Sequence, residues 1–387
     1  MTLPRQIGIG WQVGVASGWG TYGTNLAVEL VGRGIEPALF FIADPLTLTP
    51  MQAAALKEPL ARHARWREAR SKGEVKADFP ILHALGDKLD FPPILRALQG
   101  APDVGVVFFE SATIPRENIE LAARFALIVT GSTWNAEILK RHGFTNVRNC
   151  FQGVDLDLFK PGARAGRFAG RFAVFSGGKL EYRKGQDLVV AAFKKFHARH
   201  PDALLVTAWH NPWPQAAQSL GLSGHVTGPP SATGGRLDVA GWLIANGLPP
   251  DSFVDLGPLA NTATAPLLRE VDAALLPSRC EGGTNLVAME CMATGVPVIL
   301  SRNTGHLDLI GEDNCYTLDF QIPMGEVMRR PDLDGWGESS IEEIVMRLED
   351  AYSDREGARR RGAHGAAFMQ GWGWPQRIGK LLEAIGV

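Results

Sequence analysis

The feature that most constrains the fold is the alternation of short apolar runs with amphipathic segments along the 387-residue chain. Apolar runs typical of buried strands occupy residues 6–13, 36–42, 104–110, 125–132, 172–178, 203–209, 252–257, 273–278 and 297–301. Between them, apolar side chains recur at helical spacing, with glycines near the segment ends, in residues 24–34, 133–143, 186–200 and 284–295. This pattern predicts an α/β fold with two Rossmann-like domains, each built on a parallel sheet.

The domain boundary is expected in residues 160–170, a stretch rich in Gly, Ala and Arg that has little apolar periodicity. We therefore expect one Rossmann-like domain over residues 1–160 and a second over residues 171–371. A final helix pattern within residues 372–387 is expected to pack back on the first domain. Residues 210–241 are expected to form a long irregular excursion.

Composition excludes several classes of protein. The formal net charge is -2, and no basic block suggests a nucleic-acid partner. The N-terminus does not have the pattern of a signal peptide, and no apolar run approaches the roughly 20 residues that span a membrane. The four cysteines form no C-x-x-C pair and have no zinc spacing, which favours free thiols in a reducing cytosol. We therefore expect a cytoplasmic protein.

Three glycine-rich turns join a strand to a helix, in residues 14–26, 175–188 and 280–297. Ligands of parallel α/β sheets bind outside the carboxyl ends of the strands, where such turns lie. A helix N-terminus offers free N–H groups to a phosphate, and glycine allows close approach. One such turn is more often a packing feature, but three of them favour a phosphorylated ligand.

The second turn adds positive charge, because Lys179 and Lys184 lie five residues apart and Arg183 precedes Lys184. Cations beside a diphosphate neutralise it and stabilise charge that develops on a phosphate leaving group. For any one of these side chains, composition alone favours a solvated loop cation.

The third turn contains two glutamates, Glu281 and Glu290. On one continuous helix, nine residues at about 100° each would turn roughly 900° and place the two side chains on opposite faces. The intervening glycines indicate instead that Glu281 lies in a loop and that the helix begins near Thr284 or Asn285, both good N-caps. The amides of Gly283, Thr284 and Asn285 would then face an anion between the two carboxylates, a layout that suits a nucleotide sugar. The alternative is that Glu290 is a solvated helix residue, and its apolar neighbours disfavour it.

These segments resemble the retaining GT-B glycosyltransferases, family 4 of the glycosyltransferase group 1 type. The resemblance covers most of the chain, and its most specific parts are "QGVDLDLFKP", "GGKLEYRKGQDLVVAAF" and "DAALLPSRCEGGTNLVAMECMATGVPVILS". "SGWGTYGTNLA" is similar to the family's first-domain glycine loop. The resemblance implies a first domain on the acceptor side and a second that binds a nucleotide sugar.

The resemblance also implies roles for individual residues. Lys179 and Lys184 would grip the donor diphosphate, Glu281 would contact the hydroxyls of the donor sugar, and Glu290 would contact the ribose. The donor would further be lined by Gly18, Gly20, Thr21, Gly178, Arg183, Gly282, Gly283, Thr284, Asn285 and Leu286. No metal and no cofactor is expected, because lysines supply the positive charge.

The sequence departs from the family pattern in two places. Eight residues separate Glu281 from Glu290, one more than is usual, so Arg279 and Cys280 could also face the site. Where many members carry a histidine after the fourth strand of the first domain, this chain has Glu110. Glu110 is either a catalytic residue that orients or deprotonates an acceptor hydroxyl, or a buried structural glutamate bonded to the backbone.

The expected activity is transfer of a hexose-type sugar from a nucleoside diphosphate to an acceptor hydroxyl, with retention at the anomeric carbon. Three alternatives stay open: a sugar-nucleotide epimerase of GT-B fold, a glycosidase that uses Glu281 and Glu290 as its carboxylate pair, and a non-catalytic nucleotide-sugar binder. The phosphate-type turns argue against the glycosidase, because hydrolysis of a glycoside has no diphosphate to hold.

The acceptor is open among glycans, lipid-linked molecules and proteins. Residues 56–76 form a basic segment that predicts either a helix on the inner face of an anionic membrane or a solvated helix, and the second is favoured. The tryptophans at 209, 213, 242, 372 and 374 are candidates for sugar contacts, although packing is the commoner role of such residues.

Overall fold

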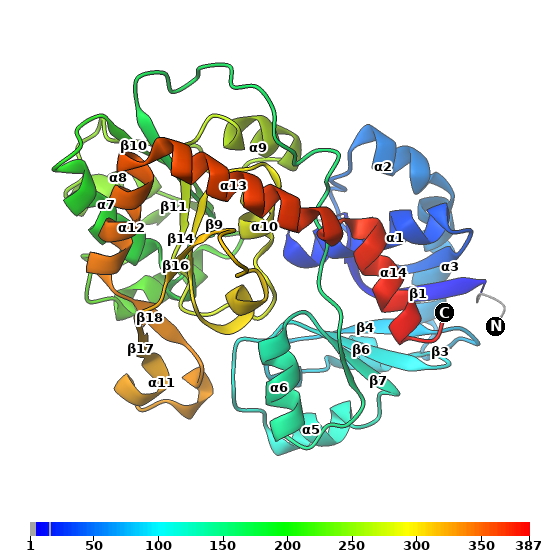
Figure 1. Cartoon of the computed structure of the whole chain (residues 1–387). Coiled ribbons are helices and arrows are strands. Elements are labelled where there is room, and N and C mark those ends of the chain that lie inside the picture. The colour runs from blue at the N-terminus through cyan, green and yellow to red at the C-terminus, as the bar shows by residue number, and fades with distance from the viewer. Residues whose placement is uncertain (1–4, 15–16) are drawn as a thin grey trace. The chain divides into compact units, whose positions relative to one another are not determined.

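The computed structural model describes residues 5–14 and 17–387 (Figure 1). The chain divides into two compact units. The first contains residues 1–153 and 372–387, and the second contains residues 154–371, so the segment 160–170 belongs to the second unit.

The first unit is built on a six-stranded parallel sheet with the strand order β2-β1-β4-β6-β7-β8. Its strands are β1 (Gln6–Val13), β2 (Glu36–Ile42), β4 (Ile81–Leu85), β6 (Asp103–Val107), β7 (Leu127–Thr130) and β8 (Val147–Asn149). Its helices are α1 (Gly18–Gly32), α2 (Pro50–Ala55), α3 (Lys57–Ser71), α4 (Pro93–Arg96), α5 (Arg116–Ala122), α6 (Thr133–Arg141) and α14 (Trp374–Ala384). The short strands β3 (Val75–Lys76) and β5 (Leu98–Gln99) pair with each other.

Helix α1 begins at Gly18, well before the apolar period that starts at residue 24. Ser17 explains this early start, because its hydroxyl accepts a hydrogen bond from the Gly20 amide at 3.2 Å and caps the helix. Gly18, Gly20 and Gly23 of the first turn therefore lie inside the helix, which corrects the expectation of a longer loop.

Aromatic rings gather beside the start of α1. The Trp11 ring packs on Trp19 and Tyr22, at centroid distances of 5.3 and 5.6 Å. Trp19 also meets Phe108 at 4.9 Å, and Tyr22 stacks on Trp374 of α14 at 5.8 Å. This region of the first unit is thus held by uncharged rings.

The second unit is built on another six-stranded parallel sheet, with the order β13-β10-β9-β14-β15-β16. Its strands are β9 (Phe172–Lys179), β10 (Ala203–His210), β13 (Phe253–Asp255), β14 (Ala273–Leu276), β15 (Val298–Ser301) and β16 (Tyr316–Leu318). Its helices are α7 (Gln186–His197), α8 (Val239–Ala245), α9 (Asn261–Leu268), α10 (Leu286–Ala293), α11 (Met324–Val327), α12 (Ile341–Ser353) and α13 (Arg355–Met369). Two small antiparallel pairs join β11 (Ala232–Thr233) to β12 (Arg236–Leu237) and β17 (Gln321–Pro323) to β18 (Gly337–Ser339).

Every apolar run that predicted a strand contains one, and the α/β fold with two parallel sheets is confirmed. The four residues of β14 are completely or almost completely buried, as expected for a central strand of a parallel sheet covered on both faces. Residues 210–241 contain the 3-10 helix Pro214–Leu222, the β11–β12 pair and the start of α8.

Three further expectations have a structural outcome. The four cysteines are free and buried. Helix α3, within the basic segment, is buried at Pro59 and Trp66 and otherwise exposed or half-buried, and Trp66 packs against Phe40 of β2 at 5.2 Å. Among the described residues, no helix has both the length and the apolar character needed to cross a membrane.

Candidate functional site

The basic turn of the second unit follows strand β9, whose last residue is Lys179. A short 3-10 helix, Tyr182–Lys184, leads to Gly185, which has a φ of 70° and precedes α7. A Cβ at Gly185 would lie 2.1 Å from the Pro277 carbonyl oxygen, so glycine is required both by backbone conformation and by close approach. This contact brings Lys184 to the segment that follows β14.

Glu281 lies in that segment and is the centre of a cluster of donors. Lys184 Nζ donates to both of its carboxylate oxygens, at 2.8 and 2.7 Å. Arg183 Nη1 donates to Oε2 at 3.1 Å. Ser278 Oγ and Asn285 Nδ2 donate to Oε1, at 2.6 and 3.0 Å. The cluster therefore joins two cations to one carboxylate that is only 3% exposed.

Burial by itself would raise the pKa of Glu281, but the charges of Lys184 and Arg183 outweigh it and lower this pKa to about 2. Burial lowers the pKa of the neighbouring His306 to about 4, although Glu281 opposes the shift. His306 is therefore neutral near pH 7, and its Nε2 lies 3.0 Å from the Asn285 amide nitrogen. The positive charge of the site therefore comes from Lys184 and Arg183, and the ring of His306 adds none.

The helix after Glu281 begins where the sequence predicted. Asn285 is the N-cap of α10, and its side chain accepts a hydrogen bond from the Ala288 amide at 3.4 Å. Asn285 has a φ of 67°, in the left-handed region that asparagine tolerates best among non-glycine residues. Within the described chain, the amides of Gly283 and Thr284 have no acceptor, so the helix start can bind an anion.

A second close approach shapes this loop. A Cβ at Gly305 would lie 1.7 Å from the Gly283 carbonyl oxygen, and the Gly305 amide donates to the Glu281 carbonyl at 3.0 Å. The Glu281 amide in turn donates to Thr304 Oγ1 at 2.8 Å. The loop backbone is thus fixed on the turn that follows β15. Gly282 is buried within it, and Leu286, the first residue of α10, is half-buried.

Glu290 differs from Glu281 in that no donors surround its carboxyl group among the described residues. Among the described residues its side chain has no hydrogen-bond or ion-pair partner, and it is half-buried on α10. Burial raises the pKa of Glu290 to about 8, and the negative charge of Asp155 adds to the rise. Near pH 7 this carboxyl is mostly protonated, so it can both donate to and accept from a ligand hydroxyl.

Lys179 points to a different neighbour. Its ammonium group lies 4.9 Å from the centroid of the Trp213 ring. Trp213 is 52% exposed, whereas Trp209, Trp242, Trp372 and Trp374 are buried packing residues. Trp213 is therefore the one of these five tryptophans that can present its ring to a ligand. Gly178, beside Lys179, has a φ of 115° and so keeps a conformation that favours glycine.

The suggestion that Arg279 and Cys280 face the site is wrong. Both residues are completely buried, and the Arg279 guanidinium is bidentate to Asp187, at 2.8 and 2.6 Å. Arg279 Nε also donates to Glu338 at 2.8 Å, and Nη1 donates to the Tyr182 carbonyl at 2.6 Å. Arg279 therefore ties the basic turn, α7 and β18 together and positions the loop of Glu281 from behind.

The first unit contains the remaining predicted site residues. Gly18, Gly20 and Thr21 lie in the first turn of α1, and the Thr21 amide donates to the Ser17 carbonyl at 2.8 Å. Glu110 follows β6, and its amide donates to Asp87 at 3.0 Å. Glu110 is partly exposed, and the alternative of a structural glutamate stays a prediction. A catalytic role for Glu110 stays a prediction.

Sequence reasoning missed Ser278, His306 and Thr304 as members of the cluster. Ser278 lies two residues after the end of β14, which is a detectable signal. His306 and Thr304 follow β15 and reach Glu281 only through the sheet order, in which β14 and β15 are neighbours. Among the described residues, no group of three or more His, Cys, Asp or Glu side chains could hold a metal ion.

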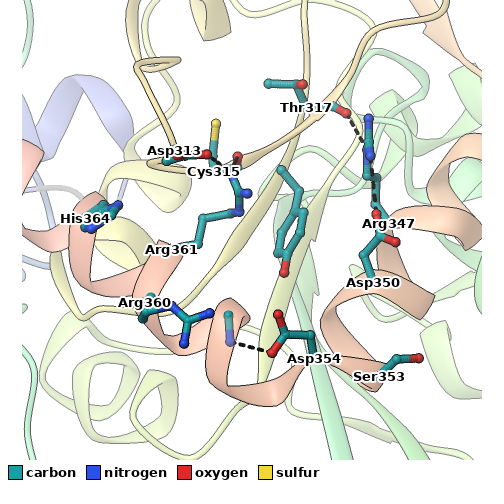
Figure 2. A pocket seen from close by; sticks show the side chains of 12 residues that line it. Asp313, Cys315, Thr317, Arg347, Asp350, Ser353, Asp354, Arg360, Arg361 and His364 are labelled. Carbon is teal, nitrogen blue, oxygen red and sulfur yellow. Dashed lines mark hydrogen bonds and ion pairs between the residues drawn. The ribbon is translucent and has the colours of Figure 1, made fainter.

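A cavity of about 670 Å³ in the second unit contains none of the predicted site residues (Figure 2). Its walls come from β16, α12 and α13. Arg347 pairs there with Asp350 at 3.2 Å, and Arg361 pairs with Asp313 at 3.1 Å. The three arginines and three aspartates that line this cavity balance in charge, so it is not the cation-rich site that the sequence predicted.

The comparisons with known structures agree with this fold. Sucrose-phosphate synthase from Thermosynechococcus elongatus matches with a TM-score of 0.67 at 18% identity, over 99% of this chain and 98% of that one. The Anabaena protein HepE, in complex with UDP-glucose, matches with a TM-score of 0.64 at 16% identity, over 98% and 99% of the two chains. Two parallel sheets and these neighbours define the GT-B fold of glycosyltransferases.

The family follows from the sequence. The family model described as Family 4 Glycosyltransferase in conflict systems matches residues 139–381, and the chain belongs to this family.

Two curated relatives match part of the chain. The GDP-mannose-dependent alpha-(1-6)-phosphatidylinositol monomannoside mannosyltransferase of Mycolicibacterium smegmatis is 25% identical, over 60% of this chain and 54% of the relative. The D-inositol 3-phosphate glycosyltransferase of Arthrobacter sp. (strain FB24) is 26% identical, over 60% and 48%. The chain thus spans about half the length of the curated relatives it matches.

Proposed function

We propose that this protein is a retaining glycosyltransferase, which moves a hexose-type sugar from a nucleoside diphosphate to an acceptor hydroxyl. The observation that carries the proposal is the cation pair Lys184 and Arg183, held on Glu281 beside the free amides at the start of α10. Membership of a glycosyltransferase family and the GT-B fold support it.

In the proposed sugar transfer, the protein must stabilise the negative charge of the departing diphosphate. Lys184, Arg183 and the amides of Gly283 and Thr284 supply positive charge and hydrogen bonds, so no metal ion is needed for this role. Lys179 adds a further cation at the end of β9. Glu281 gives these cations a fixed countercharge and so holds their side chains in position. Little free energy is then needed to rearrange them when the diphosphate binds.

The carboxylate oxygens of Glu281 already accept hydrogen bonds from several donors. In the proposed contact, a sugar hydroxyl would donate to an oxygen that also keeps these bonds. Glu290 has the free hydrogen-bonding capacity that a ribose contact requires. Its protonated state adds no negative charge near a diphosphate.

The donor and the acceptor are proposed only by class. One relative is named for a GDP-mannose donor and a phosphatidylinositol monomannoside acceptor, and one structural neighbour is in complex with UDP-glucose. We therefore propose a nucleoside-diphosphate hexose as donor and a glycan, lipid-linked or protein hydroxyl as acceptor. Glu110 is proposed to orient or deprotonate that hydroxyl, at a cytoplasmic or peripheral membrane location.

Substitution of Lys184 tests the proposal. Lys184→Ala should reduce donor use about tenfold or more, equivalent to about 1.4 kcal/mol or above, because the diphosphate loses its main cation. Sugar release from UDP-glucose and GDP-mannose and calorimetric binding of UDP and GDP measure the effect. Lys195→Ala is the matched control, since Lys195 is an exposed lysine of α7 that pairs with Glu342 on the surface.

Lys184→Arg should recover part of the loss, because arginine keeps the charge beside Glu281. A folded Lys184→Ala protein that binds and uses the donors like the wild type would remove Lys184 from the site.

A further inference from the structure

A second pocket, of about 260 Å³, lies at the other edge of the sheet in the second unit. Asp272 and Pro297, which line it, directly precede strands β14 and β15. The cluster of Lys184 and Glu281 follows the carboxyl ends of β9 and β14 instead. Because the strands of this sheet are parallel, the pocket lies at their amino ends and the cluster lies at their carboxyl ends.

Arginines dominate the charge of this pocket. Four guanidinium groups line it, from Arg164, Arg269, Arg355 and Arg359, against the single carboxylate of Asp272. Four positive charges minus one negative charge leave a formal excess of +3. We call this pocket, with its four arginines, the arginine pocket.

The one carboxylate is already engaged. Asp272 Oδ1 accepts a hydrogen bond from Arg164 at 2.8 Å, and Arg355 Nη1 lies 3.9 Å from the same oxygen. Asp272 Oδ2 accepts from the Ala173 amide at 2.9 Å. Asp272 therefore balances one arginine well and a second one weakly.

The other two arginines have no carboxylate within 4.0 Å among the described residues. Arg269 donates to the carbonyls of Lys160 and Leu158, at 3.0 and 3.1 Å, so its guanidinium is fixed in place without being neutralised. Arg359 is exposed and has no hydrogen-bond or ion-pair partner in the described part of the chain. Holding unbalanced positive charges together is unfavourable unless an anion joins them.

We propose that the arginine pocket binds a small phosphate or diphosphate anion. The planar guanidinium donates two parallel hydrogen bonds and matches phosphate oxygens better than an ammonium does. A volume of about 260 Å³ holds a diphosphate-sized group, since a water molecule takes roughly 30 Å³. An excess of three charges favours such a multiply charged anion over a single carboxylate.

The cavity of Figure 2 gives the matched control, because helix α13 lines both sites. Arg359 faces the arginine pocket, whereas its neighbour Arg360 lines the charge-balanced cavity and pairs with Glu356 at 3.1 Å. Arg359→Glu and Arg360→Glu therefore change the net charge equally, on adjacent exposed positions, but only the first changes the proposed site.

The experiment is calorimetric titration of the full chain with inorganic pyrophosphate, in a Lys184→Ala background that weakens the site of the proposed function. Lys184→Gln replaces it if Lys184→Ala does not fold. We expect one pyrophosphate bound per chain, an affinity reduced about tenfold or more by Arg359→Glu, and little change with Arg360→Glu.

Absence of pyrophosphate binding in the Lys184 background would overturn the proposal. An equal loss of affinity in Arg359→Glu and Arg360→Glu would do the same, because it would indicate a general effect of charge. Since the Lys184 variants test the donor site separately, failure of one proposal leaves the other standing.

Discussion

Both units are built on a six-stranded parallel sheet, but they differ in strand order and in the side chains near the connection between their first strand and first helix. In the first unit, β1 and α1 contribute the packed rings of Trp11, Trp19 and Tyr22. In the second unit the equivalent turn leads to α7 and carries Arg183 and Lys184, bound to Glu281. The same strand-turn-helix arrangement can therefore carry aromatic or charged side chains. These side chains, rather than the arrangement itself, decide which kind of ligand could bind there.

The difference extends to how each turn is fixed. The first unit fixes α1 by ring packing and by a hydrogen bond from Trp11 Nε1 to the Trp19 carbonyl at 3.1 Å. The second unit fixes its turn by the buried pair of Arg279 and Asp187. We thus expect substitutions to reveal electrostatic stabilisation in the second unit and steric stabilisation in the first.

The largest expected effect comes from Arg279→Leu, which would leave Asp187 buried without its partner. We expect a loss of about 3–5 kcal/mol in the free energy of unfolding, measured by urea denaturation. The double variant Arg279→Leu with Asp187→Leu removes the completely buried pair of charges and should recover part of this loss, although Glu338 still lacks its arginine. If the single and double variants were equally unstable, shape rather than charge would hold this turn.

Gly23→Ala in α1 should have an intermediate effect. Its Cβ would lie 2.6 Å from Trp11 Nε1 and 3.2 Å from a Val13 methyl carbon, both in the core of the first unit. We expect destabilisation by about 1–3 kcal/mol from overpacking, again from urea denaturation. Gly18→Ala is the matched control, because among the described residues no atom beyond its chain neighbours and its own helix backbone lies within 4 Å of its Cβ, and it should be neutral or stabilising. Equal effects of the two substitutions would contradict the steric explanation.

The smallest effect is a change in pH dependence caused by Glu290→Gln. The folded pKa of Glu290, about 8, lies above its ordinary value of 4.5, so the folded state retains a proton that the unfolded state releases. Stability should therefore fall as the pH rises from about 5 to about 8, by about 1 kcal/mol for this half-exposed group. Glu290→Gln should remove this slope in thermal unfolding scans, and a variant that keeps the full slope would assign it to another group.

The fold could be predicted because its strongest signal is local. Long apolar runs and helical periods marked the central strands and the main helices. Strands β4, β8 and β16 were missed because β4 is interrupted by His83 and the other two have only three residues each. Their place in the sheets depends on neighbours that are distant in sequence.

The candidate site could be predicted in part. Glu281, Lys184 and the Asn285 cap follow from turn chemistry, but the direct bond between Glu281 and Lys184 joins residues 97 positions apart. The burial of Arg279 could not be read from its segment, because its partners Asp187 and Glu338 come from α7 and β18. Long-range pairing, rather than local pattern, decides which charged side chains are structural.

The reactivity of the buried cysteines can be used to measure local opening of the folded chain. Burial raises the pKa of Cys150 and of Cys315 to about 11, so these thiols are almost entirely in their unreactive protonated form near neutral pH. Cys150 is the first unit's cysteine, and the second unit contains Cys280, Cys291 and Cys315. Alkylation at each position, followed by peptide mass spectrometry, would therefore time the opening of each unit separately, without any introduced label.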